Sequence, residues 1–177
     1  MITVFLILML LFAWVLIFVN FSGLVGFLLT RVPYQRTYTG EIKDIAKKLG
    51  ISSKDTFYDL GCGDGRLLFI IEQQTGAKTA GFELTWWTYF LALIKKRIHG
   101  AKTKFYCRNF FKQSWSEANY IYGYLYPHLM GRVEAKFLAD CKPGSVAIIR
   151  DFPFPNLKPV EVCNMPKKHE VYIYKKV

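Results

Sequence analysis

A glycine-rich turn between a strand-like run and a helix-like run constrains the fold of this chain more than any other feature. Residues 59–66 read Asp-Leu-Gly-Cys-Gly-Asp-Gly-Arg. The β-prone run Thr-Phe-Tyr precedes them at 56–58, and the apolar run Leu-Leu-Phe-Ile-Ile follows at 67–71. Open α/β sheets hold adenosine-containing ligands at such junctions. The segment therefore predicts an α/β fold with a ligand-binding turn after its first strand.

The spacing and charge of this turn disfavour a dinucleotide. Gly61, Gly63 and Gly65 give G-x-G-x-G, whereas the dinucleotide fingerprint is G-x-G-x-x-G with a pyrophosphate at the helix N-terminus. The sequence also lacks the phosphate loop G-x-x-x-x-G-K-[ST]. Asp59 and Asp64 would repel a pyrophosphate, since like charges about 4 Å apart repel by roughly 1 kcal/mol even in water. A ligand carrying an ammonium and a sulfonium would be attracted.

A further carboxylate stands near the end of the next strand-like run. Glu83 lies within the run 79–84, and its side chain could accept hydrogen bonds from both ribose hydroxyls. Asp64 alone could simply cap the following helix, and Cys62 is interpreted as a small residue packed in the turn. Together the turn and the acid resemble motifs I and II of class I S-adenosylmethionine (AdoMet) methyltransferases. The resemblance implies AdoMet as cofactor, bound by Asp59, Gly61, Cys62, Gly63, Asp64, Gly65 and Glu83.

The first thirty residues form a separate unit. Residues 1–30 contain no charged side chain and consist mostly of Leu, Phe, Val and Ile. About 20 apolar residues suffice to cross a bilayer, so this segment predicts a transmembrane helix. A cleaved signal peptide would need basic residues before a shorter apolar core and a small-x-small cleavage site, and neither is evident. All 24 Lys and Arg follow residue 30, which predicts a single-pass membrane protein with its catalytic domain in the cytoplasm.

Residues 31–177 suffice for one domain, and this domain carries the whole net charge of +11. Its basic clusters could touch nucleic acid, but anionic lipid headgroups are nearer to a tethered domain. A solvated basic surface explains the charge equally well, and we expect no nucleic-acid partner. The four cysteines are too widely spaced for a zinc or C-x-x-C motif, so we expect no metal site.

Strand and helix patterns alternate through this domain. We expect helices at 40–49, 66–75, 85–98 and 128–139. We expect strands at 56–60, 79–84, 103–108, 120–125 and 145–149, and a closing hairpin from 159–164 and 170–175. Such alternation predicts a Rossmann-like, mainly parallel sheet with helices on both faces.

Further segments narrow the resemblance. In chain order they are Val32-Pro33-Tyr34, Asn109-Phe110-Phe111-Lys112, Tyr126-Pro127 and Asp151-Phe-Pro-Phe-Pro155. They resemble the small membrane-anchored protein-lysine methyltransferases that include the mitochondrial enzymes acting on adenine nucleotide translocase and on the ATP synthase c-subunit, with their prokaryotic relatives. The resemblance covers residues 10–160 and implies an antiparallel last strand and a membrane-protein substrate. The family usually has an acid where this chain has Asn109, whose amide oxygen can still accept a hydrogen bond from the adenine amino group.

Ligands of such sheets sit at the carboxyl ends of the strands. The candidates for positioning the substrate are therefore Asp151, Tyr126 and, from the lead-in segment, Tyr34. We expect Asp151 to contact the substrate amine, although it could equally be a turn residue before Pro153. The two tyrosines could hold a methylammonium by cation–π contact, although ordinary aromatic packing is more common. The histidines show no ligand or triad spacing; they are His99, His128 and His169.

Three functions remain open from the sequence. The favoured one is an anchored AdoMet-dependent methyltransferase acting on a lysine of a membrane protein. The second uses the same cofactor to methylate a lipid headgroup or small amphiphile. The third is a catalytically silent AdoMet-binding or assembly protein.

Overall fold

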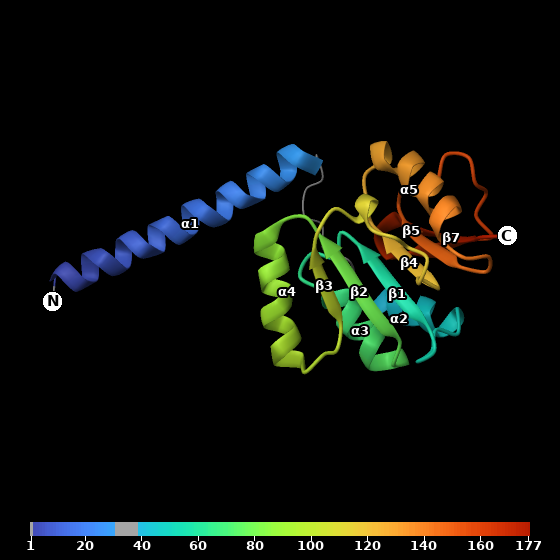
Figure 1. Cartoon of the computed structure of the whole chain (residues 1–177), viewed down its shortest axis with the longest axis horizontal. Coiled ribbons are helices and arrows are strands. Elements are labelled where there is room, and N and C mark those ends of the chain that lie inside the picture. Colours follow the sequence, from blue (N-terminus) through green and yellow to red (C-terminus); the bar gives the residue numbers. More distant parts are fainter. Residues whose placement is uncertain (1, 31–38) are drawn as a thin grey trace.

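A central sheet organises the fold, with its seven strands in the order β3-β2-β1-β4-β5-β7-β6 (Figure 1). The computed structural model describes the backbone of residues 2–30 and 39–177, and the side chains of these residues except 19, 22–30, 39–41 and 167. The strands are β1 (Thr56–Leu60), β2 (Lys78–Glu83), β3 (Lys104–Cys107), β4 (Tyr120–Gly123), β5 (Val146–Arg150), β6 (Glu161–Met165) and β7 (His169–Lys175). Strands β1 to β5 run parallel, whereas β7 is antiparallel to β5 and β6 is antiparallel to β7. The predicted parallel sheet, closing hairpin and antiparallel last strand are confirmed.

Helices cover both faces of this sheet. After the N-terminal helix α1 (Ile2–Thr30) come α2 (Thr39–Lys48), α3 (Arg66–Thr75), α4 (Trp86–His99) and α5 (Pro127–Asp140), with short 3-10 helices η1 (Phe110–Lys112) and η2 (Pro166–Lys168). Each of the four α-helices lies within a few residues of its predicted position. The start of α5 is one residue earlier than expected, because Pro127 occupies its first turn, where a missing N–H costs nothing.

Alternate side chains of each strand enter different cores. On β5, Ile148 packs with α2 and α3, whereas Ala147 and Ile149 pack with α5. This follows from the two-residue period of a strand. The central strands are therefore packed on both faces, and the loops at the carboxyl ends of β1, β4 and β5 start from this buried frame.

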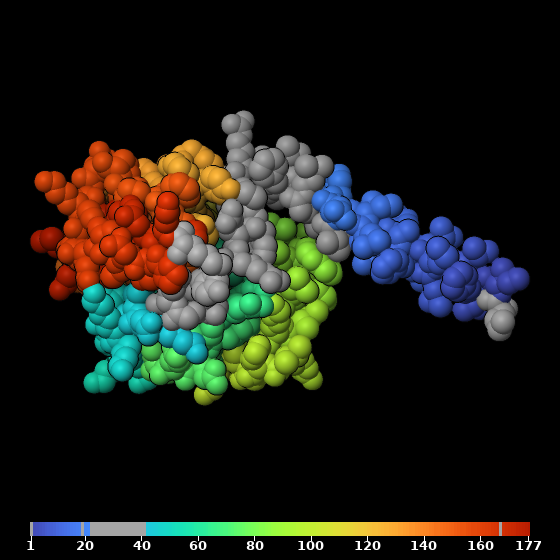
Figure 2. All heavy atoms as spheres, turned by 180° about the vertical axis from the view of Figure 1, so that it is seen from behind, coloured from blue at the N-terminus to red at the C-terminus, as the bar shows by residue number. Residues whose placement is uncertain are grey.

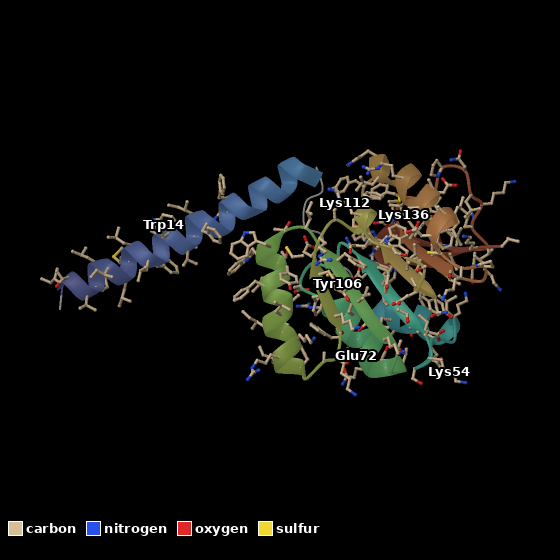
Figure 3. All side chains as sticks on the ribbon, in the orientation of Figure 1. Trp14, Lys54, Glu72, Tyr106, Lys112 and Lys136 are labelled. Atoms are coloured by element: carbon tan, nitrogen blue, oxygen red, sulfur yellow. The ribbon has the colours of Figure 1, made fainter. Side chains whose placement is uncertain are left out.

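The N-terminal helix α1 (Ile2–Thr30) is continuous over 29 residues and extends away from the sheet (Figure 1). Seen from behind, its first part projects from the rounded body of the domain (Figure 2). Its described side chains lie at 2–18, 20 and 21 and are almost all exposed, including Trp14, which stands out from the helix (Figure 3). Among the residues that the structure describes, no helix combines the length and the apolar character that a membrane span requires. The predicted single-pass span is not confirmed and stays a prediction.

Candidate cofactor and substrate site

The turn between β1 and α3 is shaped by its three glycines. Gly61, Gly63 and Gly65 have φ angles of 88°, 54° and 76°, a left-handed conformation that glycine adopts without the steric cost other residues meet. At Gly65 a Cβ atom would also lie 2.4 Å from Cζ of Phe105. The three glycines of the G-x-G-x-G motif therefore stand at the positions where the backbone of this turn is left-handed.

Cys62 faces the sheet. Its side chain is buried against Gly81 of β2, where an added Cβ would lie 2.5 Å from the Cys62 sulfur. Burial also raises the pKa of the thiol, followed in size by the effect of the Asp59 and Glu83 charges. Any contact between Cys62 and a ligand would therefore come from its backbone.

Glu83 ties the turn to the end of β2. The N–H groups of Gly61 and Cys62 donate to the Phe82 carbonyl at 2.9 and 3.0 Å. Glu83 accepts from the N–H of Gly63 at 2.9 Å and from that of Thr85 at 2.7 Å, through different carboxylate oxygens. Each oxygen can accept a second hydrogen bond. The structure thus brings Glu83 to the turn, as predicted, with acceptor capacity left for a diol.

Two further carboxyl groups lie at the turn. Asp59 is 4% exposed, and its pKa is raised to about 8 by burial and then by the charges of Glu83 and Asp64. Asp64 forms an ion pair with Lys95 of α4, which holds its pKa below the ordinary value although burial alone would raise it. With this pKa, Asp59 is mostly protonated at neutral pH as long as no cation lies beside it, because burial disfavours its charged form. A cation bound beside Asp59 would favour the ionised carboxylate.

These groups fit AdoMet and do not fit a pyrophosphate. The side-chain atoms that Asp59, Asp64 and Glu83 bring to the turn are acceptors when ionised, whereas AdoMet offers an ammonium, a sulfonium and two ribose hydroxyls. The same carboxylates, when ionised, would repel a phosphate. The geometry therefore supports the kind of ligand that the sequence predicted.

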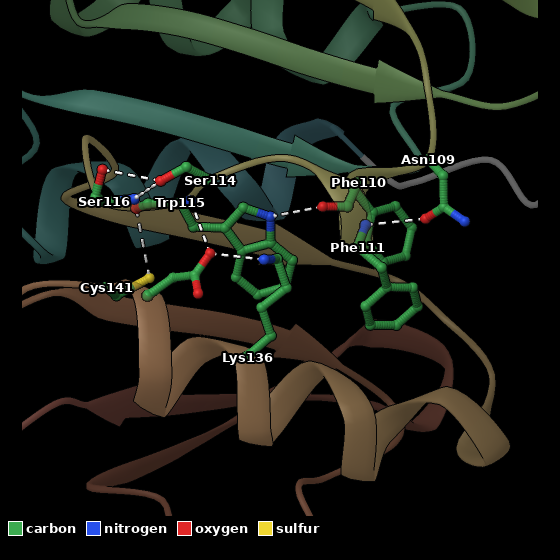
Figure 4. Close-up of polar contacts among 9 residues, drawn as sticks. Asn109, Phe110, Phe111, Ser114, Trp115, Ser116, Lys136 and Cys141 are labelled. Atoms are coloured by element: carbon green, nitrogen blue, oxygen red, sulfur yellow. Dashed lines mark hydrogen bonds and ion pairs between the residues drawn. The ribbon is translucent and has the colours of Figure 1, made fainter.

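Asn109 follows β3 and caps η1 (Figure 4). Its Oδ1 accepts from the N–H of Phe111 at 2.9 Å, which leaves one acceptor site on that oxygen. The next loop is fixed by Trp115, which is fully buried and donates from Nε1 to the Phe110 carbonyl at 3.1 Å. Because Glu83 pairs in register with Cys107 of β3, Asn109 lies at the same edge of the sheet as Glu83. Its predicted contact with adenine stays a prediction.

A second polar cluster surrounds Asp151, directly after β5. The Asp151 carboxylate accepts from the N–H of Glu170 at 3.2 Å and lies 2.9 and 3.1 Å from Nδ1 of His169. Burial and a hydrogen bond with this carboxylate raise the pKa of Tyr124. The φ angle of Asp151 is 62°, a conformation that costs a non-glycine residue about 1–3 kcal/mol and is often found at functional sites.

His169 was not predicted from the sequence. It stands 18 residues from Asp151 and meets it because β5 and β7 pair antiparallel, with Arg150 opposite Val171. The closing hairpin predicted from the sequence does not specify which residues of β5 and β7 stand opposite each other. The sequence therefore offered no spacing by which the pair could be found.

The other two predicted substrate residues have different outcomes. Tyr126 ends the loop after β4, and its ring stacks on Phe152 with centroids 6.1 Å apart. It therefore lies near Asp151 through the neighbour of that residue and is packed against an aromatic ring, and its contact with the substrate stays a prediction. Tyr34 lies outside the described residues.

The strand order places these groups along one edge. The glycine turn follows β1, Tyr124 follows β4, Asp151 follows β5, and His169 begins β7. Neighbouring strands are about 4.8 Å apart, so about 10 Å separates the ends of β1 and β5. A ligand held at the turn can extend along this edge toward the Asp151 cluster. Among the described residues, no group of His, Cys, Asp and Glu could hold a metal ion.

The ANTKMT methyltransferase domain family matches residues 59–161 of the chain. A lysine N-methyltransferase of the ATP synthase c-subunit, from Xenopus laevis, is 28% identical over 130 residues, which are 72% of this chain. The chain spans only 57% of that relative's length. A protein-lysine N-methyltransferase of Saccharolobus islandicus is 28% identical over 149 residues, covering 81% of this chain and 92% of the relative.

One solved structure shares the fold over most of the domain. It is an RNA methyltransferase from Salinibacter ruber in complex with S-adenosyl-L-homocysteine, with a TM-score of 0.76 and 22% identity. The alignment covers 80% of this chain and 93% of that protein. The expected methyltransferase sheet is thereby confirmed. Because the family match runs from Asp59 of the turn to Glu161 and covers more than half of the chain, this chain belongs to the ANTKMT methyltransferase domain family.

Proposed function

We propose that this chain transfers a methyl group from AdoMet to the side-chain amine of a lysine in a membrane-associated protein. The observation that carries the proposal is the glycine turn with its three carboxylates, in which Asp59 is buried and has a pKa of about 8. This arrangement suits a cationic ligand with a diol. The two relatives described above are both lysine N-methyltransferases, which favours lysine as the acceptor.

Residues of this chain have separate tasks in binding the donor. Asp59 and Asp64 attract the positive charges, Glu83 accepts from the ribose hydroxyls, and Asn109 accepts from the adenine amino group. AdoMet supplies a methyl group already activated by its sulfonium. The protein then has to hold the acceptor nitrogen and the methyl carbon about 3 Å apart on one line.

The acceptor lysine must first lose a proton. At neutral pH this costs roughly 4 to 5 kcal/mol for an unperturbed lysine. The His169–Asp151 pair is suited to accept the proton, since the carboxylate can only accept and Nδ1 must therefore donate to it. Nε2 of a neutral His169 is then the acceptor. In this arrangement Asp151 orients His169. The histidine then contacts the substrate amine, a role that was predicted from the sequence for Asp151.

The step balances without any further reactant. The lysine ammonium gives its proton to His169, and the nitrogen lone pair forms a bond to the methyl carbon. The carbon–sulfur bond breaks, and its electron pair remains on sulfur as a neutral thioether. The proton leaves His169 for water.

The character of α1 supports a substrate at the membrane. The whole segment 2–30 is helical and uncharged. Its side chains at 2–17 are exposed, and all of them except Thr3 are apolar. Exposure of such a helix to water is unfavourable by about 25 cal/mol per Å² of apolar surface. Membrane anchoring through residues 1–30, with the catalytic domain on the cytoplasmic side, removes that cost.

Binding of the donor is tested with Glu83 variants. Isothermal titration calorimetry should show at least several-fold weaker AdoMet binding for Glu83→Ala, because the ribose loses its acceptor. Glu83→Gln keeps one acceptor oxygen and should lose less. The exposed Glu117→Ala is the control and should bind as the unaltered chain does. An unchanged affinity in Glu83→Ala would refute the ribose assignment.

The acceptor is tested by incubating the full chain with radiolabelled AdoMet and membranes of its own host. Label in a protein band, recovered as methyllysine after hydrolysis, is the expected result. Label in the lipid extract would instead identify a lipid headgroup or amphiphile as acceptor. Measurable AdoMet binding without transfer would indicate a silent binding protein.

A further inference from the structure

The outward face of α4 carries an apolar stripe. Its members expose 47%, 47%, 44% and 75% of their surface; in chain order they are Trp86, Phe90, Ile94 and Ile98. They recur every four residues, which places them along one side of the helix. We call these four residues the α4 stripe.

Packing inside the domain does not explain the stripe. The inward face of α4 is already formed by Ala92, which is completely buried, and by the partly buried Leu93 and Tyr89. A surface helix normally carries polar residues on its outer face. Here residues 84–94 contain no charged side chain at all. Contiguous exposed apolar residues of this kind mark an interaction site.

Positive charge follows directly after the apolar turns. The last turn of α4 contains Lys96, Arg97 and His99. Arg97 and His99 are exposed, and Lys95 is already paired with Asp64. A helix that is apolar along one side and basic at its end complements a bilayer surface with anionic headgroups.

The stripe is also continuous with α1. The rings of Phe18 and Trp86 meet edge to face, with centroids 4.9 Å apart. Figure 1 shows α4 on the side of the domain from which α1 extends. The apolar surfaces of the two helices therefore meet at the first residue of the stripe.

We infer that the α4 stripe lies in the interfacial layer of an anionic bilayer, with its apolar side chains at the acyl boundary and its basic last turn among the headgroups. This contact is additional to the proposed anchor, because it belongs to the catalytic domain itself. It also fixes how that domain sits. Trp86 follows Glu83 by three residues, so the stripe begins at the sheet edge that holds the AdoMet turn, and a membrane contact there keeps this edge near the lipid surface.

The test uses nitroxide labels on the full chain in nanodiscs of phosphatidylcholine and phosphatidylglycerol. The exposed Cys107 and the half-exposed Cys163 are replaced by serine, and one label is attached at Ile94→Cys. A matched label on α3, at the exposed Gln74→Cys, serves as the aqueous control, and one at Leu10→Cys reports on α1. Accessibility to oxygen and to a water-soluble nickel chelate gives the depth of each label.

The label at position 94 should be shielded from nickel, open to oxygen and about 5–10 Å deep, while the label at 74 stays aqueous. Equal nickel access at 94 and 74 with a buried label at 10 would overturn the inference and leave the anchor standing. Aqueous behaviour at all three positions would refute both. A label at 94 that is closed to both reagents would mean that protein covers the stripe, which also overturns the inference.

Discussion

At the scale of single residues, the turn after β1 depends most strongly on Gly65. Gly65 combines a φ of 76° with a position where a Cβ would overlap the Phe105 ring at 2.4 Å. Gly100, at the end of α4, has a φ of 61° but no atom within 4 Å of such a Cβ. The two glycines therefore separate the cost of backbone strain from the cost of a steric overlap.

Gly65→Ala should lower the free energy of unfolding by about 2–4 kcal/mol, because strain and overpacking add. Gly100→Ala, the matched control, should cost only about 1 kcal/mol. Urea unfolding followed by circular dichroism measures both. Equal losses in the two variants would show that the ring of Phe105 moves aside freely.

Asp59 makes stability depend on pH. Its pKa is about 8 in the folded chain against an ordinary value of 3.8. Folding therefore favours the protonated form, and the stability this provides is complete below pH 3.8 and is lost as pH rises to about 8. Asp59→Asn should lack this fall between acidic and alkaline pH. Parallel pH–stability curves for the two proteins would contradict the burial argument.

AdoMet should bind with release of a proton at neutral pH. A cation beside Asp59 favours its ionised form, so affinity should rise with pH up to about 8. The rise approaches tenfold per pH unit when one proton is released. Calorimetry in buffers of different ionisation heat counts the proton, and Asp59→Asn should release none. A pH-independent affinity in the unaltered chain would show that the cationic part of the ligand lies elsewhere.

At the scale of elements, the sequence predicted those strands and helices that depend on local residue patterns. The strand before the glycine turn, the helix after it and the alternation up to β5 follow from residue periods and turn residues. The meeting of Glu83 with the turn was also predictable, since parallel neighbours end at the same edge. The pairing of Asp151 with His169 was not, because it depends on the register between β5 and β7, which neither strand encodes by itself. The conformation of Asp151 was equally hidden, since a positive φ at an aspartate has no sequence signature here.

His169→Ala should lower kcat by about 100-fold or more, in the range typical for loss of a proton acceptor. AdoMet affinity should stay the same, because β4 and β5 lie between β1 and the strand that His169 begins. Raising the pH should partly restore activity, because more of the acceptor lysine is then deprotonated without help from the protein. His128→Ala is the control and should keep the kcat of the unaltered chain. The same fractional loss of kcat at every pH in His169→Ala would limit this residue to a structural role.

At the scale of the whole molecule, two arrangements work together. The sheet places the proposed donor site and the Asp151 cluster along one edge, and α1 and the α4 stripe give the chain its apolar exterior. A donor site so close to apolar helices suits an acceptor at the lipid surface. Together these features support the proposal of a lysine methyltransferase that works beside the membrane.

The most direct test is the lysine methylation state of membrane proteins in the chain's own host. A strain lacking the chain is compared by mass spectrometry with strains restored by the full chain or by its Glu83→Ala variant. We predict a membrane-protein lysine that carries methyl groups with the full chain, and is unmethylated without it and much less methylated with Glu83→Ala. Identical lysine methylation in the presence and absence of the chain would contradict the proposed activity.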